Sequence, residues 1–205
     1  PMSAVYLGCK DDAILLGVTE QLVGISWLNS GGLHYAGNIG PVSLPEQQAD
    51  AWHRLGTTLA CRFHLRGLFG IDAIERDGIP WPVEINPRYT ASIEILERSS
   101  GVAFLAGHRD VFLGKTPSVR ATEDAICGKA ILYARTDIAF PSEGPWTGDA
   151  ADLDQRSYAD VPHAGEFIEA GSPILTIFAS GSTVIDCRSA LQEMAEALDR
   201  RLGSR

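Results

Sequence analysis

Two strand-like segments on either side of an Asp-Gly pair constrain the fold of this chain more than any other feature. Residues 68–74 and 81–86 are rich in apolar residues, and Asp77-Gly78 lies between them. An Asp-Gly pair between two such segments favours a β-hairpin, because both residues tolerate the backbone of a tight turn. The sequence therefore predicts an antiparallel hairpin at this position.

The second strand of this hairpin carries a polar face. Side chains alternate along a strand, so Glu84 and Asn86 must share one face. We expect Val83 and Ile85 to face the other way, into a core. A carboxylate and an amide on one face, backed by apolar residues, indicate a ligand set for a hard cation.

The register of the hairpin decides whether Asp72 joins these residues. A two-residue turn at Asp77-Gly78 pairs Asp72 with Val83 and leaves Glu84 on the opposite face. A three-residue loop, or a bulge, pairs Asp72 with Glu84 instead. Pro80 and Pro82, just before and within the second strand, cannot donate hydrogen bonds to the ladder and so favour an irregularity. A regular two-residue hairpin would exclude the metal site.

Two carboxylates paired in this way repel each other, which raises their pKa values unless a cation intervenes. Mg²⁺ suits such a site because it binds one or two carboxylates together with phosphate oxygens. Arg88 lies two residues beyond Asn86 and could make a bidentate contact with a phosphate. On spacing alone, a solvated hairpin with incidental charges is an equally good interpretation.

The same residues strongly resemble the ATP-grasp superfamily. Its pattern is an acid on one strand, a turn, and an apolar residue followed by Glu-x-Asn-x-Arg, which stands here as Asp72 and then Val83-Glu84-Ile85-Asn86-Pro87-Arg88. The resemblance implies that Asp72 and Glu84 hold one Mg²⁺ and that Glu84 and Asn86 hold a second. It implies ATP as the cofactor, with Mn²⁺ as an alternative metal. Asn86 and Arg88 would bind the cofactor, and Arg88, as the catalytic residue, would steady the transferred phosphate.

Two weaker resemblances lie outside the motif. Residues 35–38 are similar to a loop near the acceptor site of the family. Residues 90–94 follow the motif much as in some carboxylate–amine ligase branches, which would bring Ser92 and Glu94 to the substrate. Helix capping and surface solvation are equally good accounts of Ser92 and Glu94.

The periodicity and the resemblance together predict an α+β fold. Residues 1–114 would form the C-terminal lobe of an ATP-grasp domain, a largely antiparallel sheet with flanking helices. Residues 115–205 would form a small β-rich domain that ends in a helix. Within the first part, Ser43 as N-cap, a proline in the first turn and a glutamate at the third position predict a helix over residues 43–64.

Composition limits the partners of the chain. The net charge is −9, with 17 Lys and Arg residues against 26 Asp and Glu residues, so nucleic acid and anionic membranes are poor partners. The four cysteines form no CxxC pair, and there is no signal peptide or 18-residue apolar run. We expect a cytoplasmic protein that acts on a small-molecule carboxylate and an amine, with a homodimer left open.

The function expected from the resemblance is a ligase that forms an amide through an acylphosphate. Two alternatives stay open: an ATP-grasp carboxylase that uses bicarbonate, and a non-catalytic module that binds a nucleotide or a partner. The family's phosphate loop and its two nucleotide-binding lysines are not visible, and the only lysines here are Lys10, Lys115 and Lys129. We therefore expect the C-terminal part of an enzyme, inactive when isolated.

Overall fold

The computed structural model describes residues 1–117, 119, 125–148 and 156–203, which form two compact units. The first unit comprises Pro1–Glu20 and Gly40–Ile126, and the second comprises Gln21–Ile39 and Cys127–Arg205. The elements in chain order are β1 (Met2–Gly8), β2 (Ala13–Val23), η1 (Ser26–Leu28), β3 (Tyr35–Gly40), α1 (Glu46–Phe63), β4 (Gly67–Arg76), β5 (Ile79–Asn86), α2 (Ala91–Ser100), α3 (Phe104–Phe112), β6 (Ile126–Tyr133), β7 (Ile138–Ala139), β8 (Tyr158–Ala159), β9 (Phe167–Ile168), β10 (Pro173–Gly181) and α4 (Val184–Gly203).

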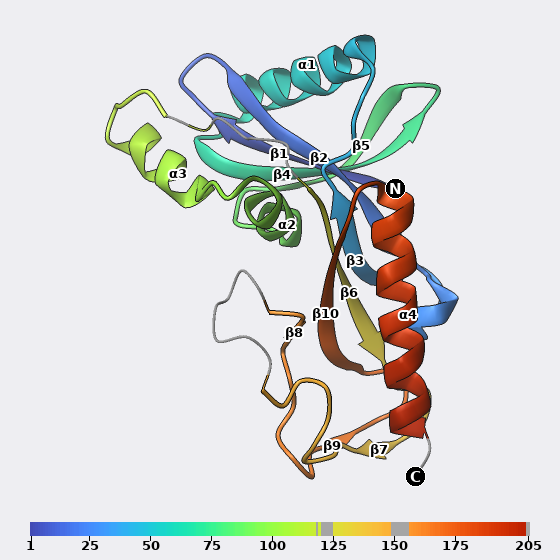
Figure 1. The fold of residues 1–205 in the computed structure, drawn as a ribbon. Helices are drawn as coiled ribbons and strands as arrows, with labels where there is room; N and C mark the ends of the chain where they lie inside the picture. The colour runs from blue at the N-terminus through green and yellow to red at the C-terminus, as the bar shows by residue number, and fades with distance from the viewer. Residues whose placement is uncertain (118, 120–124, 149–155, 204–205) are drawn as a thin grey trace. The chain divides into compact units, whose positions relative to one another are not determined.

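The first unit is an antiparallel sheet with helices on both faces. Its strands follow the order β5-β4-β1-β2, and the three pairings between them are antiparallel. Helix α1 covers one face and helices α2 and α3 cover the other (Figure 1). Two apolar clusters fill these layers, one around Trp52 and Phe69 under α1 and one around Ile93 and Leu68 under α2 and α3. Successive side chains of each strand point to opposite faces of the sheet, so the same strands contribute apolar residues to both clusters.

The second unit is built on the strand order β3-β6-β10-β8 and on the terminal helix α4. Helix α4 packs against β10, as Figure 1 also shows. Its buried residues recur every three or four positions, which gives the apolar stripe of an amphipathic helix. They are Cys187, Leu191, Ala195, Leu198 and Leu202. Strands β7 and β9 form a separate two-stranded ladder.

The α+β class, the largely antiparallel sheet with flanking helices and the terminal helix are confirmed. The boundary expected between residues 114 and 115 stays a prediction, because compact units of a structure need not coincide with domains. In the described part of the chain, no helix is both long enough and apolar enough to cross a lipid bilayer.

The start of α1 differs from the prediction. The N-cap is Pro45 and not Ser43, and no side chain caps the helix. The carbonyl oxygen of Pro45 accepts hydrogen bonds from the amides of Gln48 and Ala49, both at 2.9 Å. The reason is local, since Leu44 precedes a proline and is therefore kept out of the helical region.

Residues 35–38, expected as a loop, lie in strand β3. Glycine content concealed this strand from the sequence analysis. Gly37 has φ of 139°, and a Cβ there would fall 2.0 Å from the carbonyl oxygen of Lys129. The glycine is thus needed for close approach of the backbone, not for flexibility.

Candidate functional site

The predicted hairpin is formed by β4 and β5, joined by a two-residue turn. Arg76 pairs with Ile79, and both turn residues have positive φ, 53° at Asp77 and 76° at Gly78. Positive φ at both positions is the geometry of the type I′ turn, which matches the twist of the flanking strands. Continued regularly, this turn would place Asp72 opposite Val83.

A β-bulge corrects the register before Asp72 is reached. Ala73 pairs with Pro82, and the next pair is Asp72 with Glu84, so that Val83 is the extra residue. The predicted pairing of Asp72 with Glu84 is therefore confirmed, and the bulge rather than a three-residue loop produces it. The expectation that Val83 faces a core is wrong, because its side chain is 72% exposed. Ile85 does pack against the apolar cluster under α1.

Asp72 of β4 is the centre of a polar network to which β1, β5 and α2 also contribute. Asn86 Nδ2 donates a hydrogen bond to Asp72 Oδ2 at 3.3 Å, and Asn86 Oδ1 accepts one from Arg88 at 3.1 Å. On the other side, Ser3 of β1 is the cross-strand partner of Asp72, and its side chain acts to lower the pKa of the Asp72 carboxyl. Ser92 Oγ of α2 in turn donates to Ser3 Oγ at 2.9 Å.

Burial raises the pKa of Asp72, and the neighbouring carboxylate of Glu84 raises it further. Hydrogen bonds from Ser3 and Asn86, together with the charge of Arg88, act in the opposite direction and favour the ionised carboxylate. The net shift is upward. The fold therefore disfavours the negative charge of Asp72, and a cation bound beside the two carboxylates would offset this effect.

The residues present fit a divalent cation of the Mg²⁺ type. The cross-strand carboxylates of Asp72 and Glu84 are oxygen donors on one face of the hairpin, and Asn86 adds an amide oxygen two residues further along β5. In residues 1–117, 119, 125–148 and 156–203, there is no group of three or more His, Cys, Asp or Glu side chains that could hold a metal. A protein-only cage is not needed for Mg²⁺, because phosphate and water complete its shell. The assignment of Asp72, Glu84 and Asn86 as ligands, with Mn²⁺ as the alternative metal, stays a prediction.

Ser3 and Ser92 are the residues whose place in the site the sequence analysis missed. Ser92 is buried and contacts Ser3, so neither capping nor a surface position describes it. Ser3 stands in the central strand β1, paired on one side with Asp72 and on the other with Thr19. A signal was available, because a serine and an aspartate at matched positions of two antiparallel strands face each other. Using it requires the pairing of β1 with β4, which the sequence alone did not supply.

Thr90 stands beside this network without joining it. It is the N-cap of α2 by position, yet its hydroxyl makes no cap hydrogen bond. Its Oγ1 is buried and finds no hydrogen-bond partner among the described residues. A Cβ built on Gly70, the neighbour of Asn86 in the hairpin ladder, would lie 3.2 Å from this oxygen. Thr90 therefore fills the space that Gly70 leaves on the same face of the sheet.

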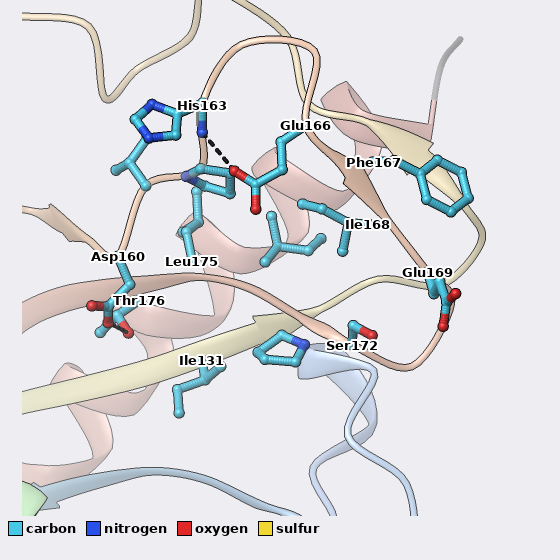
Figure 2. Close-up of a pocket in the computed structure, with 14 residues that line it drawn as sticks. Ile131, Asp160, His163, Glu166, Phe167, Ile168, Glu169, Ser172, Leu175 and Thr176 are labelled. Carbon is cyan, nitrogen blue, oxygen red and sulfur yellow. Dashed lines mark hydrogen bonds between the residues drawn. The ribbon is translucent and has the colours of Figure 1, made fainter.

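The second unit contains a hollow of about 900 Å³ that the sequence did not predict. Figure 2 shows its polar side chains spread around the rim, with Asp160 beside Thr176 at one side and Glu169 at the other. Thr176 Oγ1 donates to Asp160 Oδ2 at 2.7 Å, and the backbone amide of His163 donates to Glu166 Oε2 at 2.9 Å. His163 is exposed, and this contact of its main chain involves no ring nitrogen.

Comparison with known proteins finds a family match in the first part of the chain. The family model described as the ATP-grasp domain matches residues 1–92. An uncharacterized protein of Methanocaldococcus jannaschii is 27% identical over 169 residues, which are 82% of this chain and 39% of that protein.

Two solved structures share the fold at low sequence identity. Phosphoribosylglycinamide synthetase from Anaerococcus prevotii matches with a TM-score of 0.71 and 14% identity, over 94% of this chain and 50% of that one. The L-amino acid ligase from Bacillus licheniformis matches with a TM-score of 0.68 and 16% identity, over 94% and 51%. The chain thus spans about half the length of these structures, and 39% of the archaeal relative.

Proposed function

Because residues 1–92 match the model of the ATP-grasp domain, we propose that this chain supplies the metal- and phosphate-binding wall of an ATP-dependent carboxylate–amine ligase. One observation carries the proposal: the bulge in β5 pairs Asp72 with Glu84, beside Asn86 and Arg88, inside the segment that matches the family. The fold similarity to a synthetase and to an L-amino acid ligase supports ligation as the general class.

The proposed reaction has two steps. A carboxylate oxygen of the substrate attacks the γ-phosphorus of ATP, the bond to the bridging oxygen breaks, and ADP leaves. The amine nitrogen then attacks the carbonyl carbon of the acylphosphate, inorganic phosphate leaves with the electron pair of the C–O bond, and the nitrogen loses a proton to water. Such chemistry needs positioning and charge neutralisation more than it needs a covalent nucleophile.

The side chains of the hairpin divide this work. Asp72, Glu84 and Asn86 would hold Mg²⁺, which when bound neutralises charge on the phosphate oxygens. Arg88 is exposed, and its guanidinium donates one hydrogen bond to Asn86 Oδ1 and one to the carbonyl oxygen of Tyr89. A guanidinium has five N–H donors, so Arg88 retains donors for the transferred phosphate. Its bond to Asn86 keeps it beside the metal ligands.

The test is ATP-dependent phosphate release by the natural-length protein, screened against amino acids, small amines and bicarbonate. The proposal expects release only when a carboxylate and an amine are both supplied, and expects hydroxylamine to trap the acylphosphate as a hydroxamate. Release with bicarbonate and no second carboxylate would replace the ligase with a carboxylase. Release under no condition would replace it with a non-catalytic binding module.

A further inference from the structure

We propose that Ser3 and Ser92 act as a hydroxyl relay that positions Asp72 for metal binding. Ser92 Oγ donates to Ser3 Oγ at 2.9 Å, and Ser3 stands opposite Asp72 in the ladder between β1 and β4, so the proposed relay continues from the Ser3 hydroxyl to the Asp72 carboxylate. This inference rests on the proposed function, since it assigns two further residues to the same metal site.

Burial makes the relay a fixed structure and not a surface contact. Ser3 is 1% exposed and Ser92 is 3% exposed. A buried hydroxyl without a partner costs free energy, so the two serines satisfy each other and the carboxylate. Each O–H that donates along a chain of hydrogen bonds also strengthens the next bond, which favours one orientation of the acceptor at the end.

The backbone around Ser3 holds the relay in place. β1 is paired on both sides at Ser3, with Thr19 of β2 and with Asp72 of β4. The carbonyl oxygen of Ser3 also accepts a hydrogen bond from Thr19 Oγ1 at 3.3 Å. The main chain of Ser3 is therefore fixed by both neighbouring strands.

Helix α2 fixes the other end. Ile93 and Leu96 of α2 belong to the apolar cluster that contains Val5 and Leu68 of the sheet. That packing sets the height and rotation of the helix above β1, and Ser92 is thereby presented to Ser3. The relay joins a buried helix to the carboxylate through two short side chains with little rotational freedom.

Residues that orient a metal ligand have a measurable effect without contacting the metal. Loss of such an outer partner lowers metal affinity about 10-fold to 100-fold. Asp72 has two supports of this kind, the relay on one side and Asn86 Nδ2 on the other. The relay differs from Asn86 because neither serine is itself a predicted ligand.

The experiment is a titration of the 205-residue chain with MnCl₂, with free Mn²⁺ followed by electron paramagnetic resonance. We expect Ser3→Ala and Ser92→Ala each to weaken Mn²⁺ binding about tenfold. The double variant Ser3→Ala/Ser92→Ala should bind no more weakly than Ser3→Ala, because in the relay Ser92 acts on Asp72 through Ser3. Independent effects of the two serines on packing would add instead.

Ser99→Ala is the matched control. Ser99 lies on the same helix and is buried, but its hydroxyl donates to the carbonyl oxygen of Ala125 and does not reach the site. This variant should lose thermal stability without losing Mn²⁺ affinity. Binding by Ser3→Ala within twofold of wild type, or additive effects in the double variant, would overturn the relay alone. Failure of the wild-type chain to bind Mn²⁺ would overturn the proposed metal site and the relay with it.

Discussion

Carboxylates gather in two regions of the molecule, the β4–β5 hairpin of the first unit and the hollow of the second, and they are held in different ways. In the hairpin, Asp72 receives contacts from β1 and β5 and stands opposite Glu84. In the hollow, Asp160 and Glu166 each accept a hydrogen bond from a neighbour on the rim. The hollow is large, but its acids do not converge on a common point. The register of the hairpin places two carboxylates opposite each other, whereas the hollow keeps its carboxylates apart.

The largest expected effect is a loss of Mn²⁺ affinity on substitution of acids in the hairpin, with no such loss in the hollow. We expect Asp72→Asn and Glu84→Gln to lower Mn²⁺ affinity by about 100-fold or more, beyond the usual loss for an outer partner, because each removes a predicted ligand. Glu166→Gln in the hollow should leave affinity unchanged. The measurement is the titration described above, and weaker binding in Glu166→Gln with normal binding in Asp72→Asn would reverse the comparison.

Arg88→Lys should separate metal binding from catalysis within the hairpin. Lysine keeps the charge but loses the planar, two-pronged donor geometry. Loss of one such contact to developing charge costs on the order of 100-fold in kcat. Mn²⁺ affinity should change little, since Arg88 is not a predicted metal ligand. Steady-state kinetics of the natural-length protein test this expectation, and an equal fall in kcat and in metal affinity would contradict it.

Thermal stability measured without metal should show how far the ionised carboxylate of Asp72 destabilises the fold. The pKa of Asp72 is raised in the fold, so the ionised group destabilises the folded chain at neutral pH. Asp72→Asn should therefore raise Tm at pH 7 by roughly 1–3 °C. The gain should shrink as the pH falls through the raised pKa and vanish near pH 3, where the carboxyl is protonated in both states. Calorimetric scans in chelator at several pH values measure this.

Asp12→Asn is a control that should change Tm in the opposite direction to Asp72→Asn. Hydrogen bonds from the Thr57 hydroxyl and the Ala13 amide, with a contribution from the charge of His53, lower the pKa of Asp12. The ionised group therefore stabilises the fold above its unfolded pKa, and the substitution should lower Tm at pH 7. The difference from wild type should close as the pH falls through the lowered pKa. The same sign for both variants would contradict the electrostatic account.

The smallest effect should come from deletion of Val83. Without this residue, the two-residue turn at Asp77-Gly78 pairs Asp72 with Glu84 in a regular ladder. Mn²⁺ affinity should stay within about threefold of wild type, a margin smaller than the loss expected for an outer partner. Loss of binding comparable to that in Glu84→Gln would mean that the bulge itself shapes the site.

The parts of the site that could be predicted from the sequence are close together in the chain. Alternation placed Glu84 and Asn86 on one face, and the turn residues limited the register to two arrangements. The choice between a loop and a bulge could not be made, because Pro80 and Pro82 allow either one. Val83 was misplaced for the same reason, since alternation is broken at the bulge.

Features that depend on distant strands could not be predicted. Ser92 and Ser3 are 89 positions apart in the sequence, and their contact follows from the packing of α2 on β1. Strand β3 was missed because Gly37 serves close backbone approach, which local composition does not distinguish from a loop. The sequence therefore predicted that Glu84 and Asn86 share one face of the hairpin, and it did not predict the neighbours that β1 and α2 bring to Asp72.

The bulge at Val83 allows the turn at the tip of the hairpin to change length without changing the pairing of Asp72 with Glu84. An odd number of residues separates Asp72 from Glu84, so an even turn must leave one residue unpaired and an odd turn need not. Changes of two residues at the tip preserve this parity, and a loss of one residue is absorbed when the bulge disappears. The carboxylates can thus tolerate insertions and deletions in the turn above them. A peptide tag or a fluorescent label could be grafted at Asp77-Gly78 with Asp72 and Glu84 kept in register.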